Sequence, residues 1–517
     1  MCESAQKSSH QNFKEEKPIM KKAFKFLFVA ALIALMAVSA VACGGNGEGD
    51  ATPTPTPDGQ TSSAGGVYVK PGETYSFYSW QYTSEQPYSG DDERSQAMRE
   101  RVEKIETTYQ VTIQFVPNGS QTSMLQSAFQ GVPDITGMKE GGLHTMMSTY
   151  LYQNLTGQCL TPLSDHSDVY DFRDTEKFNV YSQYDLCEYN DKLWFFIPVE
   201  IGIHFECGGN ALVFNKKLCQ AAGYPAETIY DWVNKGEWTW ERFEEVLVKT
   251  TDTQKGIWGI ERGNEALVMW SLANSNGTEF VTLETMDNGQ KQDKFVYSGD
   301  KGERLMQAYD EFLKLANELK VMDTKYYGGV STEPLEHFLA EKTAFFYNGY
   351  SSNPLKSISQ ASFDYGLVPW PKGPSNKANE NEYYSMYPHL NPYCVFRDVN
   401  GNIKGAVQML CWLYTPIYDA NSEDAKTLYE TEKSLYTKDA ESAKNLDLVE
   451  ANKQHFRVFM YSNAPCSING MNTVGTALFG KGEDSILKRE TSAKQYFSSI
   501  AQAVNIAITN RSPYSWK

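Results

Sequence analysis

Apolar and polar positions alternate in an order that predicts short strands separated by helices. Residues 74–82 (TYSFYSWQY) are aromatic and predict a strand, and residues 111–116 and 134–138 predict two more. Residues 91–108 and 123–130 lie between them and predict helices. The first of these helices carries its apolar residues on one stripe: Met98, Val102 and Ile105. Strands that alternate with helices in this way predict right-handed crossovers and a parallel sheet.

The same kinds of element continue further along the chain. Residues 190–199 resemble one arm of a hairpin, and residues 211–214 predict a buried strand. Residues 240–249 predict an amphipathic helix, which Thr239 would cap at its amino end. We find no repeat of the length that solenoid proteins use. These patterns favour an α/β fold.

The start of the chain has the pattern of a secretory signal. Basic residues, Lys21 and Lys22 among them, precede an apolar run over residues 26–42, and the run ends on small residues before Cys43. The end of the run resembles a bacterial lipobox, in which the cysteine is acylated. A plain membrane anchor is the alternative, but the run falls short of about 20 residues. We therefore expect a signal peptide over residues 1–42, with an over-extended start before Met20, and lipidation of Cys43.

A tether is expected directly after the signal. Residues 43–66 contain no apolar cluster and include a Thr-Pro repeat over residues 52–57. Alternating prolines keep a chain extended, and such a composition cannot bury a core. With Cys43 in front of it, the segment predicts a flexible link between a membrane surface and a folded body.

Charge and cysteine content narrow the possible partners. A formal net charge of −17 argues against a nucleic-acid partner, which needs a basic surface. Without Cys2 and Cys43, an odd number of cysteines remains, and they include no C-x-x-C pair. We expect most of them to be buried free thiols, with no metal site and no cofactor.

Five segments carry a resemblance to a known family. They occur in the family's order, from about Tyr75 to Leu413, and each matches one of its motifs: residues 131–135 (GVPDI), 210–218 (NALVFNKKL) followed by 221–223 (AAG), 237–245 (EWTWERFEE), 344–349 (AFFYNG) and 366–374 (GLVPWPKGP). Together they resemble the extracellular solute-binding proteins, family 1 or maltose-binding-like, of bacterial sugar ABC importers.

The resemblance implies an α/β, two-lobed, periplasmic-binding-protein-like (type II) fold with a hinge and an interlobe ligand cleft. The chain would cross the hinge near Val213, near Val368 and after Trp412. The implied division has four folded segments: residues 67–212 in lobe 1, 213–367 in lobe 2, 368–415 returning to lobe 1, and 416–517 as C-terminal helices mainly on lobe 2.

The resemblance also implies capture and delivery of a solute rather than covalent chemistry. A sugar fits the aromatic content of 13%, because aromatic rings face the C–H face of a pyranose while polar groups take its hydroxyls. Most aromatics in a large domain belong to its core, so only those at strand ends and crossings are candidates. The candidate ligand-binding residues are Trp80, Tyr82, Glu206, Trp270, Tyr347, Asn348, Tyr350, Trp370 and Tyr387.

Other functions remain as alternatives. The sequence contains no G-x-S-x-G, H-E-x-x-H, P-loop or G-x-G-x-x-G motif that opens a helix, so we expect no enzyme. A secreted glycan-acting enzyme with a carboxylate pair is one alternative. The same fold with a peptide or other solute as its cargo is another. The expected partners are a small-molecule ligand and ABC permease subunits, at the outer face of the cell membrane, for a monomer anchored by its lipid.

Overall fold

The computed structural model describes residues 66–512 with internal gaps. Every described residue lies in one compact unit, Pro55–Lys517. The gaps are residues 80–87, 91–92, 118–141, 146–159, 174–186, 190, 196–210, 262–264, 324–331, 348–351, 378–381, 388–392, 397–401, 416–417, 419–421, 456–460, 462–463, 469–470 and 481–490. Cys43 and the expected signal and tether lie outside the described residues, apart from Gly66.

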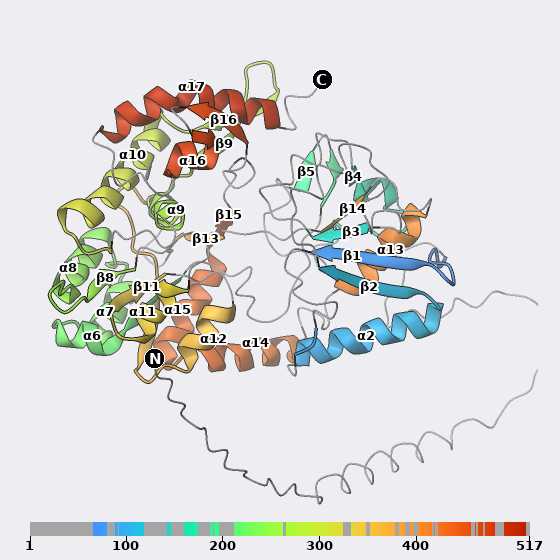
Figure 1. Cartoon of the computed structure of the whole chain (residues 1–517), viewed down its shortest axis with the longest axis horizontal. Coiled ribbons are helices and arrows are strands. Elements are labelled where there is room, and N and C mark those ends of the chain that lie inside the picture. The colour runs from blue at the N-terminus through green and yellow to red at the C-terminus, as the bar shows by residue number, and fades with distance from the viewer. Residues whose placement is uncertain are drawn as a thin grey trace, which may run out of the picture. The chain divides into compact units, whose positions relative to one another are not determined.

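One sheet contains five strands in the order β2-β1-β3-β14-β4 (Figure 1). Its strands are β1 (Thr74–Ser79), β2 (Thr112–Pro117), β3 (Gly142–Thr145), β4 (Leu160–Thr161) and β14 (Tyr393–Phe396). β1 pairs in parallel with β2 and β3, which confirms the expected parallel pairing of the strands predicted at residues 74–82 and 111–116. The strand predicted at residues 134–138 and the helix predicted at residues 123–130 lie outside the described residues. β14 returns from much later in the chain and pairs antiparallel with β3 and β4, so the sheet as a whole is mixed.

Two helices pack together beside this first sheet. α2 (Glu93–Tyr109) places Met98 and Ile105 in the core as expected, with Val102 partly buried against it, and α13 is Ile403–Tyr414. Tyr109 of α2 stacks on Trp412 of α13 at 4.4 Å between ring centroids. Arg101 is 6% exposed and donates to the carbonyl oxygens of Leu413, at 3.0 Å, and Thr415. A cation that binds the last carbonyls of a helix stabilises its carboxyl end.

The second sheet contains four strands in the order β12-β7-β11-β8. Its strands are β7 (Ala211–Asn215), β8 (Trp258–Ile260), β11 (Thr343–Phe346) and β12 (Tyr365–Pro369). β7 runs antiparallel to both β11 and β12, and β11 is parallel to β8. Every residue of β7 and β12 is buried, which fits the continuous apolar run that predicted a strand at residues 211–214.

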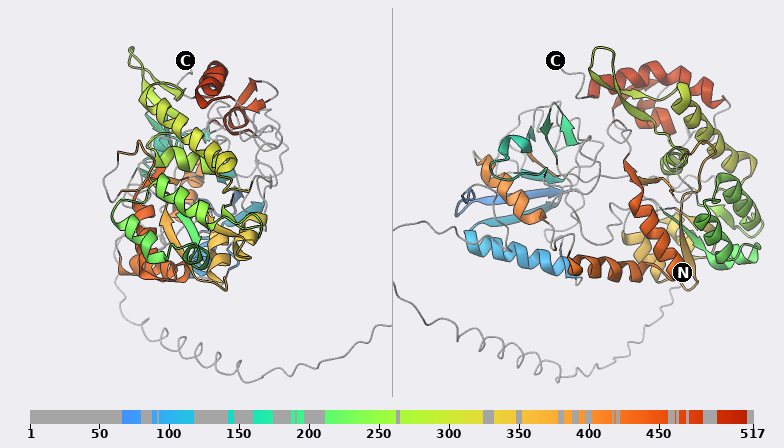
Figure 2. Two further views of the ribbon diagram at one scale, coloured as in Figure 1. Left: turned by 90° about the vertical axis from the view of Figure 1, so that its left-hand side faces the viewer. Right: turned by 180° about the vertical axis from the view of Figure 1, so that it is seen from behind.

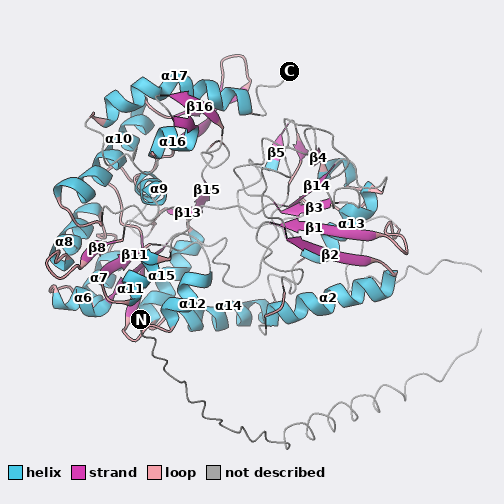
Figure 3. Cartoon of the chain, in the orientation of Figure 1, coloured by secondary structure: helices cyan, strands magenta, loops and turns pink. Residues whose placement is uncertain are grey.

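Helices surround this second sheet (Figures 2 and 3). Most of them lie on the chain segments that connect its strands, and the last two follow β12. They are α6 (Lys216–Ala221), α7 (Ala226–Asn234), α8 (Trp240–Thr250), α11 (Glu333–Leu339), α12 (Ser352–Ser359), α14 (Glu423–Tyr436) and α15 (Ala440–Ala451). α8 begins after Thr239 as expected, but the Thr239 side chain makes no capping hydrogen bond. The Thr239 backbone carbonyl instead accepts the Phe243 N–H at 2.9 Å. Thr239 also forms a parallel β-bridge with Lys372, in the segment after β12.

β5 (Glu188–Tyr189) and β6 (Lys192–Leu193) form a separate antiparallel pair. Apart from these two strands and two short 3-10 and π-helical segments, the remaining described elements form a further helical layer and small ribbons. They are α9 (Glu265–Ser275), β9 (Val281–Thr285), β10 (Lys291–Phe295), α10 (Gly299–Leu313), β13 (Ser385–Tyr387), β15 (Lys453–His455), β16 (Pro465–Ile468), β17 (Met471–Thr473), α16 (Val474–Phe479) and α17 (Ala493–Arg511). Phe497 of α17 packs edge-on against Phe295 of β10 and Tyr309 of α10, with centroids 5.6 and 5.2 Å apart. The last long helix is therefore part of this core.

The cysteines within the described residues are buried and form no disulfide with one another, as expected for thiols used as small apolar side chains. They are Cys187, Cys219, Cys394, Cys411 and Cys466. Burial, with the nearby charge of Glu188, raises the pKa of Cys187 to about 12, so its thiol stays protonated at neutral pH. None of the helices in the described part of the chain is long and apolar enough to cross a membrane.

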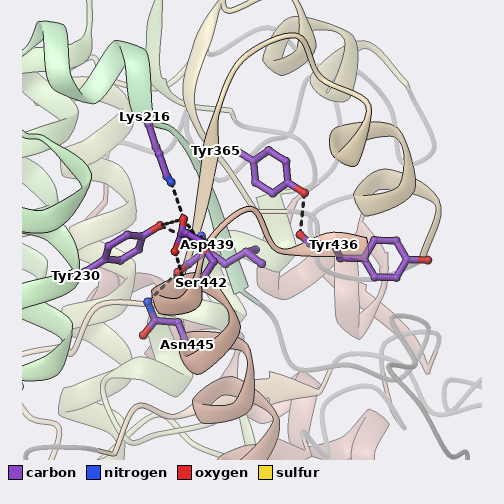
Figure 4. A network of polar contacts seen from close by, with 8 residues as sticks. Lys216, Tyr230, Tyr365, Tyr436, Asp439, Ser442 and Asn445 are labelled. Atoms are coloured by element: carbon purple, nitrogen blue, oxygen red, sulfur yellow. Dashed lines mark hydrogen bonds and ion pairs between the residues drawn. The ribbon is translucent and has the colours of Figure 1, made fainter. Parts of the chain in front are cut away.

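A polar network fixes α15 to the second sheet (Figure 4). Asp439 caps α15 by accepting the Ser442 N–H at 2.7 Å, and it pairs with Lys216 of α6 at 2.5 Å. The Ser442 hydroxyl accepts the Leu367 N–H of β12 at 3.0 Å, and the Asn445 amide donates to the Leu367 carbonyl at 2.9 Å. α15 therefore bonds to the backbone of the edge strand β12, which leaves less of this edge open to another chain.

The ion pair and the helix cap can be separated by substitution. Asp439→Asn keeps an N-cap of similar strength but removes the charge, and we expect it to cost about 1–2 kcal/mol of unfolding free energy. Asp439→Ala removes the cap as well and should cost roughly 1 kcal/mol more. Urea unfolding measures both. Asp231→Asn, which breaks the exposed pair with Lys235, is the control and should change stability by less than about 0.5 kcal/mol.

The cost of Asp439→Asn should also depend on pH. Burial opposes ionisation of Asp439, but the hydrogen bonds from Lys216 and the Ser442 N–H prevail and hold its pKa below the ordinary 3.8. A lowered pKa means that the stabilisation is complete above the unfolded value and is lost as the pH falls through the folded value. Wild type and Asp439→Asn should therefore differ at pH 6 and converge below pH 3.8. A difference that stays constant with pH would contradict this role.

Candidate functional site

The structure places some of the predicted ligand residues and leaves others outside the described residues. Tyr347 and Trp370 are described with their side chains, as is Trp270, and Tyr387 is described in its backbone. The others lie outside the described residues: Trp80, Tyr82, Glu206, Asn348 and Tyr350. The site is therefore built from Tyr347 and Trp370, which the fold brings together.

Tyr347 and Trp370 share one edge of the second sheet. Because β7 is antiparallel to both β11 and β12, these two strands end at the same edge. Tyr347 directly follows β11, and Trp370 directly follows β12. Their rings meet edge to face at 6.0 Å between centroids and 68° between planes. In an open α/β sheet, ligands bind outside the carboxyl ends of the strands.

A layer of aromatic rings supports this edge. Trp370 packs edge-on against Phe243 of α8 at 6.2 Å, and Phe243 packs edge-on against Phe345 of β11 at 5.1 Å. Trp238 also stacks on Phe345, with 6.4 Å between the ring centroids. Each such pair is worth about 0.5–1.5 kcal/mol beyond its buried area. The rings therefore hold Trp370 and Tyr347 in a defined orientation.

Hydrogen bonds hold the backbone on both sides of Trp370. The Trp238 indole N–H donates to the Pro369 carbonyl at 2.9 Å, and the Lys372 N–H donates to the Trp238 carbonyl at 2.9 Å. The Gly373 N–H donates to the Ser275 carbonyl of α9 at 2.9 Å. A Cβ at Gly373 would lie 2.4 Å from Asn276 Oδ1, so only glycine allows this close approach. This explains the glycine of the P-W-P-K-G-P segment.

Trp370 has an unusual feature, because its indole N–H is buried without an acceptor among the described residues. The residue is 1% exposed. Trp238, which is equally buried, satisfies its own N–H on Pro369. An unpaired buried donor costs about 1–3 kcal/mol and calls for an explanation in the function of the site. Tyr347 is 2% exposed, so both rings are covered in this structure.

The other described candidates lie on different elements. Trp270 belongs to α9 and packs edge-on against Phe479 of α16 at 5.2 Å. It is 6% exposed and forms part of the core between these helices. Tyr387 ends β13, where it pairs with His455 of β15. The structure therefore brings Tyr347 and Trp370 into direct contact and locates Trp270 and Tyr387 on separate elements.

A second polar cluster was not anticipated from the sequence. Glu261, Asp323 and His337 come from separate segments and place side-chain ligand atoms within 4.8 Å of one another. Burial is the main cause that raises the pKa of Glu261 to about 7, the Thr343 hydroxyl opposes the rise, and the charges of Asp323 and Glu333 add to it. Distances of 62 and 14 residues separate the three positions along the chain, so no local motif signals the cluster.

Two buried tryptophans provide a test of the unpaired indole. Trp238→Phe leaves the Pro369 carbonyl without its donor, whereas Trp370→Phe removes a donor that has no acceptor among the described residues. Both changes remove a similar volume. We therefore expect Trp238→Phe to cost about 1–2 kcal/mol more unfolding free energy than Trp370→Phe. Urea unfolding of both variants measures the difference, and equal costs would show that the Trp370 N–H is satisfied.

Comparison with known proteins defines the fold. No family model matches the chain, and no curated protein matches it in sequence. Solved structures do match over most of its length. The ABC substrate-binding protein Lmo0181 from Listeria monocytogenes, in complex with cycloalternan, superposes with a TM-score of 0.54 at 14% identity, over 85% of this chain and 99% of that one.

Two further structures agree. UgpB from Mycobacterium tuberculosis, in complex with glycerophosphocholine, has a TM-score of 0.55 at 13% identity and covers 85% of this chain and 99% of its own. A cyclic alpha-maltosyl-1,6-maltose binding protein from Arthrobacter globiformis has a TM-score of 0.53 at 14% identity, with coverages of 85% and 100%. The chain thus has the two-lobed, type II periplasmic-binding-protein fold of ABC substrate-binding proteins, which confirms the fold expected from the motifs.

Proposed function

We propose that this protein is the substrate-binding lipoprotein of an ABC importer, which captures a sugar or oligosaccharide in its interlobe cleft and delivers it to the permease. The observation that carries the proposal is the paired Tyr347 and Trp370 at the carboxyl edge of the second sheet, in a chain with this fold. Among the matched structures, Lmo0181 is in complex with cycloalternan, and the Arthrobacter globiformis protein is a cyclic alpha-maltosyl-1,6-maltose binding protein.

The burial of the two rings favours a role beneath the proposed ligand rather than in direct contact with it. A ring that stacks on a sugar needs one open face, and Trp370 and Tyr347 are only 1% and 2% exposed. We propose that they form a rigid floor beneath the ligand. The direct contacts are then proposed for the residues that follow β11 and for those predicted on other segments: Asn348, Tyr350, Trp80, Tyr82 and Glu206.

Uptake would follow from closure of the two lobes around the ligand. A ligand that touches both lobes only in the closed form binds that form more tightly, and so shifts the population towards it. The closed form is then proposed to dock on the permease, with no covalent change to the cargo. A monomer suffices for this mechanism.

A different cargo is the second candidate. UgpB, which binds glycerophosphocholine, superposes as well as the sugar-binding structures do. The fold therefore does not select the chemistry of the ligand. A peptide or another small solute would use the same hinge and a different set of polar contacts.

Thermal unfolding against a ligand panel distinguishes these functions. The panel contains mono- and oligosaccharides, glycerophosphodiesters and short peptides. A ligand that binds only the native protein stabilises it by about 2.7 kcal/mol at a hundredfold excess over Kd. We expect one glycan class to raise the midpoint and to be recovered intact. Breakdown of the glycan would indicate an enzyme, and a rise with peptides or phosphodiesters alone would reject the sugar.

Two substitutions separate contact from support. Tyr350→Ala should weaken binding of the identified ligand by at least tenfold, about 1.4 kcal/mol, with little loss of stability. Trp370→Ala should lower the unfolding free energy by about 3–5 kcal/mol, because it leaves a cavity in the aromatic layer. Leu435→Ala, at a side chain of α14 that is 61% exposed, is the control that should change neither quantity. Calorimetric titration and urea unfolding provide the two readouts.

Anchoring through Cys43 is proposed from the sequence alone. A lipid at this position would keep the protein near its transporter and raise its effective concentration there. Cys43→Ser should move the protein from the membrane fraction to the soluble extracytoplasmic fraction and abolish labelling by an alkyne fatty acid. Cys219→Ser, which replaces a buried thiol of α6, should leave the membrane location and the labelling unchanged. Retention of the Cys43→Ser protein in the membrane would contradict acylation at this residue.

A further inference from the structure

Three separate segments bring a carboxylate pair and an imidazole to one place. Glu261 directly follows β8, and Ile260 forms a parallel bridge with Met322. In such a bridge the next residues, Glu261 and Asp323, lie side by side. α11 packs against β11, the neighbour of β8, and carries His337 in its last turn. The register of the sheet and the position of α11 therefore create the cluster.

The geometry of the cluster is close to that of a metal site. One potential ligand atom from each of Glu261, Asp323 and His337 lies within 4.8 Å of the others, and His337 Nδ1 lies 3.6 Å from Glu261 Oε2. Ligands that bind one ion tetrahedrally at about 2.0–2.2 Å lie about 3.3–3.6 Å apart. The distance between His337 and Glu261 already fits this spacing, and side-chain shifts of about 1 Å bring the most distant ligand atoms to it.

The surroundings of Glu261 are a second, independent indication of a cation site. The residue is 0% exposed, and its Oε2 accepts the Thr343 hydroxyl at 2.8 Å. Its Oε1 is buried without a partner among the described residues. Among the described residues, His337 is the one basic side chain that lies within ion-pair distance of Glu261. A buried carboxylate with an unsatisfied oxygen is costly unless a cation or donor compensates it.

The chemistry of the ligands selects the class of ion. We propose that Glu261, Asp323 and His337 bind one divalent transition-metal ion, and that they bind Zn²⁺ in preference to Ca²⁺ and Mg²⁺. Two oxygen ligands and one imidazole nitrogen form a set that zinc accepts, whereas Ca²⁺ and Mg²⁺ prefer oxygen ligands alone. The His337 side chain is 36% exposed, which gives the ion a route from solvent.

The ion would add a coordination link between elements that backbone hydrogen bonds and packing already bring together. It links the end of β8, the segment at Asp323 and α11 in one coordination sphere. The site is formed by elements of the second sheet and uses none of the residues proposed to contact the sugar. Its role is therefore to stabilise this part of the fold, and its occupancy can be measured independently of any transport ligand.

The test is metal binding to the full chain without a polyhistidine tag. The protein is stripped with a chelator and titrated calorimetrically with Zn²⁺, and its thermal midpoint is followed. Wild type should bind one equivalent with a rise in midpoint. Glu261→Gln and His337→Ala should each weaken binding by more than tenfold. Glu341→Gln and His166→Ala, an acid and a histidine outside the cluster, should bind like wild type.

Glu261→Gln also separates metal loss from misfolding. The neutral amide replaces a buried charge of nearly the same shape, so the metal-free variant should unfold at a midpoint no lower than that of metal-free wild type. Co²⁺ as a spectroscopic probe should give visible absorption bands of an imidazole-ligated site that disappear in His337→Ala. Absence of stoichiometric Zn²⁺ binding, equal binding by the cluster variants, or binding of Ca²⁺ in preference to Zn²⁺ would each overturn the proposal.

Discussion

The antiparallel placement of β7 between β11 and β12 is the constraint on which the candidate site depends. β7 is buried along its whole length, and its pairing on both sides forces its two neighbours to run in the same direction. Both neighbours therefore end at one edge, where Tyr347 and Trp370 meet. A Cβ at Gly366 would lie 2.3 Å from the Tyr230 hydroxyl, so the approach of β12 to α7 requires glycine at this position. The position of the site is thus set by backbone pairing before any ligand is considered.

Sequence patterns predicted local elements well where the apolar period was clear. The stripe of Met98 and Ile105 predicted α2, and the apolar run at residues 211–214 predicted β7. Long-range pairing was not accessible in the same way. Nothing in the residues of β14 indicates that it inserts between β3 and β4, because antiparallel and parallel partners use the same kinds of side chain. Thr239 was correctly placed before α8, although its backbone rather than its side chain bonds there.

The candidate site was predictable in part and for an identifiable reason. Tyr347 was selected at the end of an expected strand and Trp370 at an expected hinge crossing. The structure places both directly after strands that end at one edge of the sheet. The aromatic layer of Trp238, Phe243 and Phe345 was not selected, since its members look like ordinary core residues in the sequence. Glu261 and His337 were missed because their proximity depends on the register of β8 and on the position of α11. Motifs in the sequence therefore indicate where strands end and where the chain crosses between lobes. Contacts between side chains of distant elements can be seen only in the three-dimensional structure.

Both sheets can be completed only late in synthesis, because each needs a segment from the last part of the chain. The first sheet needs β14, at residues 393–396, to join β3 and β4, and the second needs α15 to cover β12. During synthesis, the ribosome must release more than 390 residues before the first sheet can close, and more than 440 before α15 can dock. Pairings between such distant segments form slowly, because the intervening chain must first be closed into a loop. A nascent chain of this protein therefore remains incompletely folded until its last quarter has emerged.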